Sequence, residues 1–438
     1  MRNTSASLHI DSTFHRHHRV TISIDSIDIS GLNRSMENQA RRYCNDQQTS
    51  ACERKPGLSL YSPDDCESTA IGSLDAGIPA PSDSIVVSHE NTAFGNSQTY
   101  WAHHSHIPKG HKCQIVAPKD RELALRGYGN FSLAYSTAVQ PRLEHFGDER
   151  GYIAFARRNG VTFVLGDPVA DQQIAGELLQ QFLKQYRSPS FVNITENTAR
   201  VLSNNGFWVN EIGVDTRLDL RSLHFRGKEN EWLRYADNWT RRRGMQVREF
   251  SADSIRHEIE LVSEAWRTTR TVRRKEVRFL NRPIVVADEV GVRRFGLFES
   301  DGSLQAFVFF DPLFKDNQIV GYVTCIKRRR PECNGYVETA IVKRAMEVFQ
   351  SENIPSLWLG LSPFYKIENE TYRSNRWMHH TTRYYHQAKW FNRWLYNFQG
   401  HSEYKKRFAG EEHKIYYASR VRWNTFRFLT LASLCGVF

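Results

Sequence analysis

The chain has 438 residues and a net charge of +11, and 40% of its residues are hydrophobic and 12% aromatic. This apolar content excludes global disorder, and the length predicts two packed units rather than one. The sequence has no run of about 18 uncharged apolar residues and no apolar segment near its start, which excludes a membrane-spanning helix and a secretory signal.

The positive charge is unevenly distributed. Residues 1–110 contain 9 basic and 12 acidic residues, so the rest of the chain carries a net charge of +14. This balance favours anionic partners such as nucleic acid, acidic lipid or a phosphorylated substrate, although a basic surface that only confers solubility has the same composition. The 7 cysteines are scattered and none forms a Cys-x-x-Cys pair, which predicts reduced thiols in a cytoplasm and no metal site.

Residues 1–111 predict a polar, His- and Ser-rich extension that is mostly disordered. Eight of the 17 histidines fall within residues 1–110. They could bind a metal ion, but no acidic or cysteine ligands are spaced with them, so solvated histidines are favoured.

Residues 112–225 predict a first globular unit. A hairpin is expected where Asn159-Gly160 separates two short apolar runs, and Gly166-Asp167-Pro168 ends its second strand. The predicted elements are strands over 152–157, 161–165, 191–194 and 207–212, and a helix whose apolar face contains Ile174, Leu178, Phe182 and Leu183.

Residues 226–420 predict a second unit, followed by a basic apolar tail over 421–438. The predicted elements are strands over 293–299, 304–310, 318–325 and 356–360, with Asp311-Pro312 ending the second strand, and an amphipathic helix over 337–349. The segments Phe155–Pro168 and Phe298–Pro312 share a strand, a Gly turn, a strand and an Asp-Pro pair, which favours a tandem duplication. Hairpins mixed with helices predict an α+β fold with antiparallel-rich sheets flanked by helices.

The common catalytic motifs GxxxxGK[ST], GxSxG, HExxH and GxGxxG are absent from the sequence. A less standard segment, RRRPECNGYVE, covers Arg328–Glu338. Its arginines could neutralise phosphates, its loop and helix N-terminus could bind an oxyanion, and Glu338 could hold an ammonium group. An exposed arginine run followed by a helix-capping glutamate would give the same pattern.

Three further segments carry candidate residues. WLGLSPF, over Trp358–Phe364, predicts a strand that stops at Gly360-Leu361-Ser362-Pro363, where free backbone groups could bind a substrate carbonyl or simply end the strand. Two groups of basic residues each follow aromatic residues. One is Arg241, Arg242 and Arg243 at a helix end, and the other is Lys405, Lys406 and Arg407 near the C-terminus. The tail 421–438 could lie in a membrane interface or pack on the body as a last helix, and packing is favoured because its polar face is thin.

At four of these places the sequence resembles the catalytic domain of the phosphatidylglycerol lysyltransferase family, the multiple peptide resistance factors of bacteria. The matching segments are, in order, GDP at Gly166–Pro168, RRRPECNGYVE at Arg328–Glu338, LGLSP at Leu359–Pro363, and LYNFQGHSEYKKRF at Leu395–Phe408. The resemblance spans about Leu125–Ser419.

The resemblance implies two tandem acetyltransferase-like (GNAT) domains, over 112–225 and 226–420, with the active site in the second. It also implies transfer of an aminoacyl group from an aminoacyl-tRNA to an acceptor hydroxyl, typically of a lipid, without a cofactor. The residues then expected in catalysis are Glu338 for the α-amino group, Gly360 and Ser362 for the ester carbonyl, and Lys405 for the acceptor or a phosphate. Those expected to bind tRNA phosphates are Arg241, Arg242, Arg243, Lys327, Arg328, Arg329, Arg330, Lys406 and Arg407. Those expected to shape the motifs are Asp167, Pro168, Gly335 and Pro363.

The sequence departs from the family pattern in two ways. No segment matches the family's integral membrane part, so the acceptor could be a phosphatidylglycerol-like lipid or a small molecule, and the polar extension is also outside the pattern. The expected location is the cytoplasm, with peripheral contact at the inner face of the membrane through the tail.

Two other functions compete with this one. An acyl-CoA-dependent N-acyltransferase would share the fold, but its pyrophosphate loop [RQ]xxGx[GA] is not matched by the RPECNG stretch that follows Arg329. A non-catalytic RNA- or membrane-binding protein would use the same basic residues and would bind without turnover.

Overall fold

The computed structural model describes residues 116–269, 277–389, 392, 397–422 and 425–436, all of them within the compact unit Ser88–Phe438. The extension predicted over 1–111, with its histidine clusters, lies outside the described residues, as does part of the arginine run over 267–278. Among the described residues, no helix combines the length and the apolar character that a membrane span requires.

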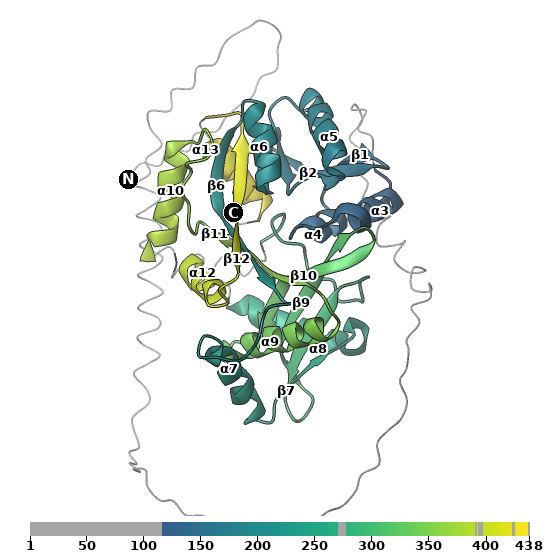
Figure 1. Ribbon diagram of the computed structural model, residues 1–438, viewed down its shortest axis with the longest axis vertical. Coiled ribbons are helices and arrows are strands. Elements are labelled where there is room, and N and C mark those ends of the chain that lie inside the picture. Colours follow the sequence, from purple (N-terminus) through teal and green to yellow (C-terminus); the bar gives the residue numbers. More distant parts are fainter. Residues whose placement is uncertain (1–115, 270–276, 390–391, 393–396, 423–424, 437–438) are drawn as a thin grey trace, which may run out of the picture. The chain divides into compact units, whose positions relative to one another are not determined.

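The described strands form one mixed sheet of 12 strands (Figure 1). The strands are β1 (Glu144–Asp148), β2 (Gly151–Arg158), β3 (Val161–Leu165), β4 (Val169–Ala170), β5 (Ser190–Ile194), β6 (Trp208–Asp219), β7 (Gln246–Glu249), β8 (Arg293–Phe298), β9 (Leu304–Lys315), β10 (Gln318–Arg329), β11 (Ser356–Pro363) and β12 (Glu411–Ser419). Their order across the sheet is β1-β2-β3-β5-β12-β6-β11-β10-β9-β8-β7, and β4 pairs with β2.

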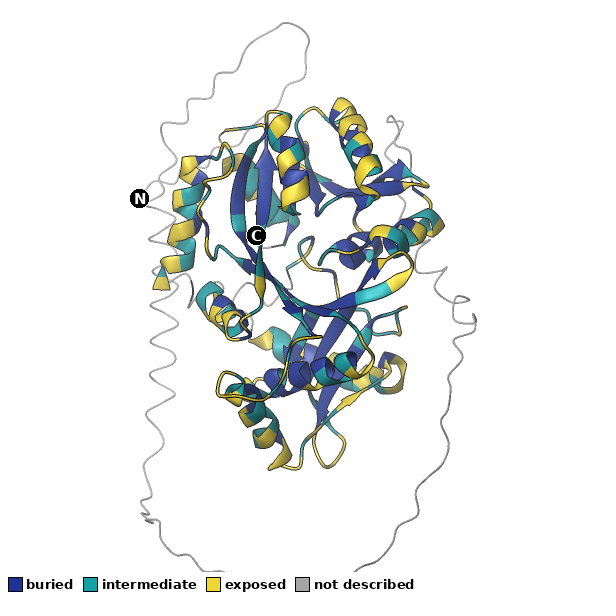
Figure 2. Cartoon of the chain, viewed as in Figure 1, coloured by how far each residue is buried: buried dark blue, intermediate teal, exposed yellow. Residues whose placement is uncertain are grey.

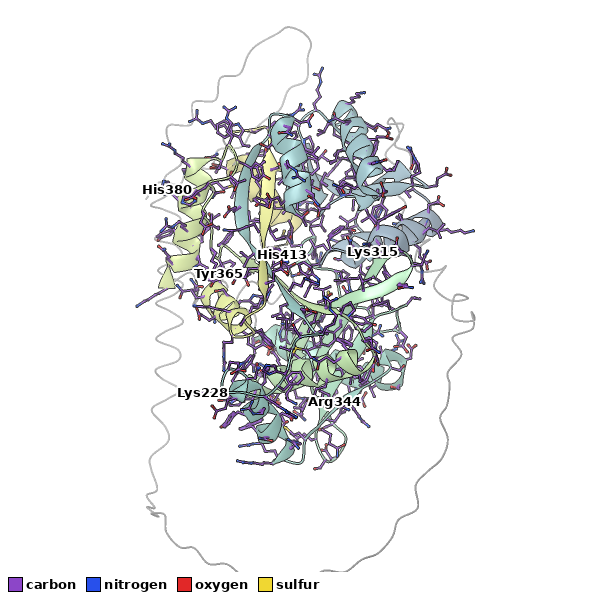
Figure 3. The ribbon with its side chains drawn as sticks, viewed as in Figure 1. Lys228, Lys315, Arg344, Tyr365, His380 and His413 are labelled. Carbon is purple, nitrogen blue, oxygen red and sulfur yellow. The ribbon has the colours of Figure 1, made fainter. Side chains whose placement is uncertain are left out.

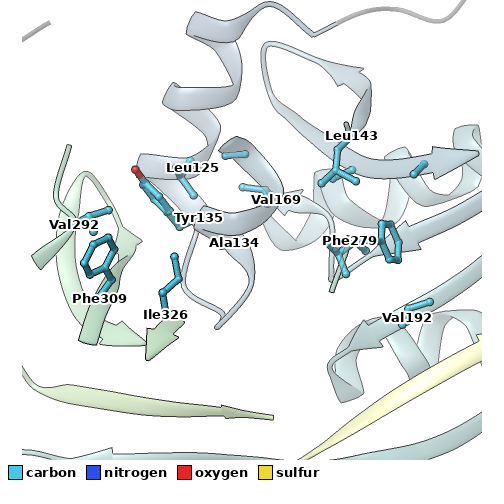
Figure 4. Close-up of a cluster of buried hydrophobic side chains, with 14 of the residues drawn as sticks. Leu125, Ala134, Tyr135, Leu143, Val169, Val192, Phe279, Val292, Phe309 and Ile326 are labelled. Carbon is cyan, nitrogen blue, oxygen red and sulfur yellow. The ribbon is translucent and has the colours of Figure 1, made fainter. Parts of the chain in front are cut away.

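Helices flank this sheet and bury its side chains in three clusters (Figure 2). The helices are α3 (Pro118–Tyr128), α4 (Ala134–Val139), α5 (Gln172–Gln185), α6 (Glu196–Asn204), α7 (Glu231–Arg241), α8 (Arg256–Thr268), α9 (Tyr336–Ser351), α10 (Arg376–Gln387), α12 (Phe398–Lys406) and α13 (Thr425–Leu434), with a 3₁₀ turn at Ala252–Ile255. One cluster lies under α5 and α6, a second under α7 and α9, and the third under α3, α4, α8 and α13. Figure 4 shows the third cluster, where Leu125 and Tyr135 pack with Phe309 and Ile326. The predicted α+β fold with a large mixed sheet is therefore confirmed.

The locally predicted elements are confirmed where turn residues set them. Asn159 and Gly160 both have positive φ, 48° and 75°, and they join β2 to β3 as an antiparallel pair. Two left-handed residues in a two-residue turn match the twist of a hairpin, which explains why Asn-Gly predicts it. The helix predicted from Ile174 to Leu183 is α5, and its Leu178 and Phe182 are fully buried. The tail packs on the body as α13, because Phe428, Leu431 and Leu434 lie against the third cluster.

The structure contains a repeated arrangement of strands and helices, but the second copy begins at a different strand from the one that the sequence predicted. In the first part, the β2–β3 hairpin is followed by α5 and by β5, which is parallel to β3. In the second part, the β9–β10 hairpin is followed by α9 and by β11, which is parallel to β10. The hairpin equivalent to β2–β3 is β9–β10. The segment Phe298–Pro312, which the sequence pairs with Phe155–Pro168, instead contains the turn between β8 and β9, one hairpin earlier.

The predicted end of a strand at Asp311-Pro312 is wrong, because β9 continues to Lys315. The pairing of β9 with β8 stops at Phe310, and beyond that point β10 is the one described strand that pairs with β9. Proline lacks a backbone N–H, but it is tolerated where one side of a strand needs no donor, and Pro312 sits in that one-sided stretch.

The strand predicted over 356–360 is β11, which extends to Pro363, the last residue of the predicted stop at Gly360–Pro363. Its pairing with β6 shifts in register between Trp358 and Leu361, and Gly360 in this irregular stretch has a φ of 78°. The strand therefore bulges at Gly360 and resumes, and Pro363 pairs with Gly213 at its end.

The sheet is continuous across residue 225, where the sequence predicts a domain boundary. β12 comes from the end of the predicted second unit, yet it lies between β5 and β6 and pairs antiparallel with both. The segment after 410 therefore completes the sheet of the first part. A division into two tandem acetyltransferase-like domains stays a prediction that the repeated topology supports.

Candidate functional site

The candidate site lies where the backbone pairing between β10 and β11 ends, a place called the opening below. These two strands pair in parallel only at Tyr322 with Leu357 and at Val323 with Trp358. Past this point the Thr324 hydroxyl donates to the Leu359 carbonyl at 3.1 Å, and the bulge at Gly360 turns β11 away. A Cβ added at Gly360 would lie 3.8 Å from both the Thr324 carbonyl oxygen and Lys405 Nζ, so the lysine nitrogen sits at this opening.

Lys405 reaches the opening from α12, which packs on β11. Its Nζ donates to the carbonyl oxygens of Gly360, at 2.5 Å, and Leu361, at 2.8 Å, and the residue is 2% exposed. Burial lowers the pKa of Lys405 well below its ordinary value, the positive charge of Lys327 adds to this effect, and the carboxylate of Asp215 opposes it. A buried lysine with a depressed pKa can lose its proton and act as a base.

Two more nitrogen groups lie beside Lys405. The Lys327 ammonium is 5.3 Å from the centre of the Tyr404 ring, and burial lowers the pKa of Lys327. Burial also lowers the pKa of His401 well below its usual range, and Lys405 and Lys327 lower it further. Like charges in a poorly solvated place disfavour one another, so this cluster resists full protonation.

Glu338 lies at the start of α9 and is paired with an arginine. The Arg329 Nε donates to Glu338 Oε1 at 3.1 Å, and Arg329 also donates to the Cys333 carbonyl. The Glu338 side chain is 27% exposed and therefore accessible from outside. A substrate ammonium at Glu338 would compete with, or share, the carboxylate that Arg329 holds.

The three consecutive arginines of β10 do not form one phosphate-binding group, because strand side chains alternate between faces. Arg329 points toward Glu338, whereas Arg328 is 3% exposed and stacks over Trp266 of α8 at 5.0 Å. Arg330 donates from its Nε to the Leu304 carbonyl at 3.1 Å. The structure brings Lys327 and Arg329 together and places Arg328 on the opposite face.

The loop before α9 is largely capped by its own residues. Asn334 Oδ1 accepts from the Tyr336 amide at 3.1 Å, and the Asn334 carbonyl accepts from the Val337 amide at 3.2 Å. Gly335 has a φ of −59°, a value open to any residue, so the conformation alone does not require glycine there.

The predicted basic residues of α7 lie at the same end of α9. Trp239 and Tyr336 are in ring contact at 5.7 Å, and the Arg243 guanidinium lies 3.8 Å over Trp239. Arg241 pairs with Asp237 at 3.3 Å and Arg242 is exposed. On α12, Lys406 is exposed and Arg407 lies 4.2 Å over Trp232 of α7. These residues therefore line the surface around Glu338 rather than the buried opening.

The remaining predicted residues have structural surroundings. Asp167 Oδ1 accepts from the Thr195 amide at 3.0 Å, and burial raises the pKa of Asp167. Pro168 is buried between β3 and β4. Ser362 is 1% exposed, and its hydroxyl has no hydrogen-bond partner within the described part of the chain. The Gly360 and Leu361 carbonyls, proposed as free backbone groups, are taken by Lys405.

Sequence reasoning missed Asp215, which lies on β6 directly opposite Leu361 and His413. Asp215 is 3% exposed and lines a pocket of about 210 Å³ with Ser132, Trp358 and His413, the last labelled in Figure 3. Burial raises the pKa of Asp215, while the Ser132 hydroxyl, Lys405 and His413 oppose the shift. Asp215 lies beyond the strand predicted over 207–212, so its burial could not be inferred from that strand, although buried carboxylates are rare without a partner.

Comparison with known proteins places this arrangement in a family. Residues 121–419 match the family model described as "Phosphatidylglycerol lysyltransferase, C-terminal". The structure of L-PGS from Bacillus licheniformis is similar, with 18% identity, a TM-score of 0.61, and coverage of 75% of this chain and 99% of that one. So is the C-terminal domain of a putative lysylphosphatidylglycerol synthetase from Agrobacterium fabrum, with 17% identity, a TM-score of 0.59, and coverage of 73% and 98%. None of the curated protein sequences compared with this chain matches it.

The shared fold and the family match define the class as a transferase of acyl groups. Because the family model covers more than half of the chain, the protein belongs to the phosphatidylglycerol lysyltransferase C-terminal family. The resemblance identified from four short motifs is therefore confirmed.

Proposed function

We propose that the protein moves an aminoacyl group from an aminoacyl-tRNA to the hydroxyl of a lipid such as phosphatidylglycerol, or of another small acceptor. Family membership supports lipid aminoacylation. The main structural support for the site is that Lys405 is buried at the opening between β10 and β11 and has a lowered pKa. No cofactor enters this reaction, because an aminoacyl ester is already activated.

In the proposed step, the acceptor hydroxyl attacks the ester carbon. The new acceptor oxygen–carbon bond forms, the bond from that carbon to the tRNA ribose oxygen breaks, and the acceptor proton ends on the ribose oxygen. Neutral Lys405 keeps two N–H bonds for the Gly360 and Leu361 carbonyls and offers its lone pair to the acceptor proton. The carbonyls thus hold the base in one orientation.

The donor would approach from the side of α7 and α9. Glu338 would hold the α-amino group there, while Lys327, Arg329 and the arginines at 241–243 would contact phosphates near the tRNA end, with Lys406 and Arg407 on α12 nearby. Arg328 and Arg330 are engaged within the fold and would contribute less. Because tRNA is a cytoplasmic molecule, we place the protein in the cytoplasm, peripheral to the membrane.

The acyl-CoA alternative would use the loop before α9 for a pyrophosphate. Two of the amides there are already capped by Asn334, and Glu332 and Glu338 place negative charge at the same helix end. Carboxylates beside the amides repel a pyrophosphate, so these observations favour the tRNA donor.

A transfer assay tests the proposal. The full chain is mixed with tRNA charged with radiolabelled amino acids and with phosphatidylglycerol vesicles, and labelled acetyl-CoA is run in parallel. Label in the organic phase supports the proposal, and label released only into water-soluble products removes the lipid acceptor. Turnover of acetyl-CoA without transfer from tRNA supports the alternative, and binding of both ligands without turnover supports a non-catalytic protein.

Replacing Glu338 with glutamine should lower kcat/KM for the aminoacyl-tRNA by about 10- to 100-fold, since the amide loses the charge that attracts the α-ammonium group. The matched control is Glu332→Gln, an exposed residue of the same loop, which should stay near wild type. Steady-state kinetics with charged tRNA measure both. Wild-type kinetics for Glu338→Gln would remove the assigned role.

Replacing Asp215 with asparagine should move the acidic limb of the pH–rate profile to lower pH. The Asp215 carboxylate stabilises the charged form of Lys405, so its removal lowers the pKa of Lys405 further and the base becomes neutral at lower pH. Glu411→Gln, an exposed residue 60% accessible on the next strand, is the control and should leave the profile in place. An unmoved limb in Asp215→Asn would mean that another group titrates.

A further inference from the structure

Two helices, α10 and α13, begin on the same face of the sheet. Tyr417 of β12 contacts Phe428 of α13, with ring centres 5.2 Å apart. Its partner across the strands, Asn210 of β6, exchanges two hydrogen bonds of 3.1 Å with Asn375, the N-cap of α10. Residues directly opposite in an antiparallel pair project to the same face, so α10 and α13 cover one face of the sheet (Figure 1).

The outer sides of these helices carry large apolar side chains. Among the described residues, the three most exposed large hydrophobic side chains are Phe426 at 60%, Tyr384 at 55% and Leu429 at 55%. Trp377, seven residues before Tyr384 on α10, is 41% exposed. Residues seven apart share a helix face, so Trp377 and Tyr384 form an aromatic stripe on the outer side of α10, away from the face that buries Met378 and Thr382.

The same surface is strongly basic. Exposed arginines are found at 373, 376, 383, 420 and 422, and residues 371–389 and 418–436 contain no Asp or Glu. Within the described part of the chain, none of these five guanidinium groups pairs with a carboxylate, whereas exposed arginines elsewhere, such as Arg221 and Arg256, do so at 2.9 and 3.0 Å. This surface therefore lacks internal compensation and suits an anionic partner.

A pocket lies where the two helices begin. It has a volume of about 320 Å³ and is lined by Trp208, Ser374, Asn375, Arg376, Trp377 and Arg422. The guanidinium of Arg373 lies 3.8 Å over the Trp208 ring, and that of Arg422 lies 5.7 Å from it. Stacking on an aromatic ring holds a guanidinium in place while leaving its N–H groups available for a phosphate oxygen.

We propose that this α10–α13 face binds the surface of an anionic lipid membrane. Trp377, Tyr384, Phe426 and Leu429 enter the boundary between headgroups and acyl chains, the five arginines contact lipid phosphates, and the pocket beside Trp208 takes one headgroup. An RNA would use the arginines and could stack on the aromatic rings, but it offers no apolar medium for Leu429. The membrane therefore accounts for both properties of the face.

Vesicle sedimentation tests this with the full chain and without any tRNA. Wild type should bind vesicles of phosphatidylcholine and phosphatidylglycerol more tightly than vesicles of phosphatidylcholine alone. The double variant Arg376→Glu/Arg383→Glu should lose at least about tenfold in partitioning to the anionic vesicles, because each basic residue near such a surface contributes about a factor of five. Leu429→Ser should weaken binding to the same vesicles without changing charge.

The matched control is Arg221→Glu/Arg344→Glu, two exposed arginines on other elements, which makes the same change in net charge and should bind like wild type (Arg344 is labelled in Figure 3). Vesicle binding that is absent in wild type, or equal in the two double variants, overturns the proposal. Loss of tRNA binding with vesicle binding intact would assign the face to RNA and overturns it too. Vesicle binding is measured without acyl transfer, so its outcome can be interpreted even if the proposed reaction is not found.

Discussion

Replacing Lys405 with methionine should reduce aminoacyl transfer by about 10²- to 10⁴-fold, the range expected for loss of a positioned general base. Methionine has a similar length and no basic nitrogen, so the acceptor hydroxyl would have to lose its proton to water. The reduction should appear in kcat, because in the proposed step Lys405 acts on the acceptor hydroxyl rather than on the tRNA phosphates. Single-turnover transfer from charged tRNA to phosphatidylglycerol vesicles measures it.

The same substitution leaves the buried carbonyls of Gly360 and Leu361 without their donor, which should cost about 1–3 kcal/mol of unfolding free energy. Urea unfolding of the variant therefore accompanies the kinetics and shows whether the protein is folded at the assay temperature. Lys184→Met is the matched control, since Lys184 is an exposed lysine on α5 to which no role in the proposed reaction is assigned, and it should lose little activity and little stability. A folded Lys405→Met protein with wild-type kcat would rule out the base.

The elements that the sequence predicted correctly are those set by local signals. The β2–β3 hairpin follows from Asn159-Gly160, whose left-handed backbone fits a hairpin turn, and α5 follows from apolar residues three and four apart. The predicted break at Asp311-Pro312 failed because a proline is tolerated in a strand where a neighbouring strand does not need its N–H, and β8 no longer pairs with β9 there. At Gly360 the strand bulges, with a positive φ at the glycine, and it ends at Pro363 within the predicted stop.

The site depended on contacts that no local pattern contains. Lys405 and Gly360 are 45 residues apart in the chain, and the resemblance placed both in one active site without indicating that the lysine nitrogen donates to the Gly360 carbonyl. The insertion of β12 between β5 and β6 places His413 beside Asp215, a neighbour almost 200 residues earlier. Arg328 and Arg329 point to opposite faces because side chains alternate along a strand. The strand predicted over 318–325 ended before them, whereas β10 continues to Arg329, so this alternation was not expected.

Replacing Arg282 with methionine should lower the unfolding free energy by about 3–5 kcal/mol, the cost of removing one partner from a buried ion pair. The Arg282 side chain is fully buried and donates to Asp311 at 2.7 to 3.1 Å and to Glu289 at 3.0 and 3.1 Å. Asp311 belongs to the Asp-Pro pair that the sequence assigned to a strand end. Without the guanidinium, two carboxylates would remain close together in the core.

The loss should depend on pH in a defined direction. Burial already raises the pKa of Glu289, and the charge of Arg282 holds this rise in check, so the pKa rises further in the variant. When the pKa of a carboxyl is higher in the folded than in the unfolded state, the group destabilises the fold fully at pH values above its folded pKa. This destabilisation decreases as the pH falls toward the unfolded pKa of about 4.3. Urea unfolding at neutral pH and near pH ~4.5 should therefore show a smaller deficit at the lower pH.

Two comparisons separate the buried pair from charge in general. Arg256→Met removes an exposed pair with Asp253 and should cost no more than about 1 kcal/mol. The triple variant Arg282→Met/Asp311→Asn/Glu289→Gln removes the charges of this cluster together and should recover much of the loss, because the penalty comes from buried carboxylates that lose the Arg282 guanidinium, with Arg294 left as a weaker partner of Glu289 at 3.5 Å. If Arg282→Met alone were as stable as Arg256→Met, the cluster would contribute nothing to holding β9 and the 277–292 segment together.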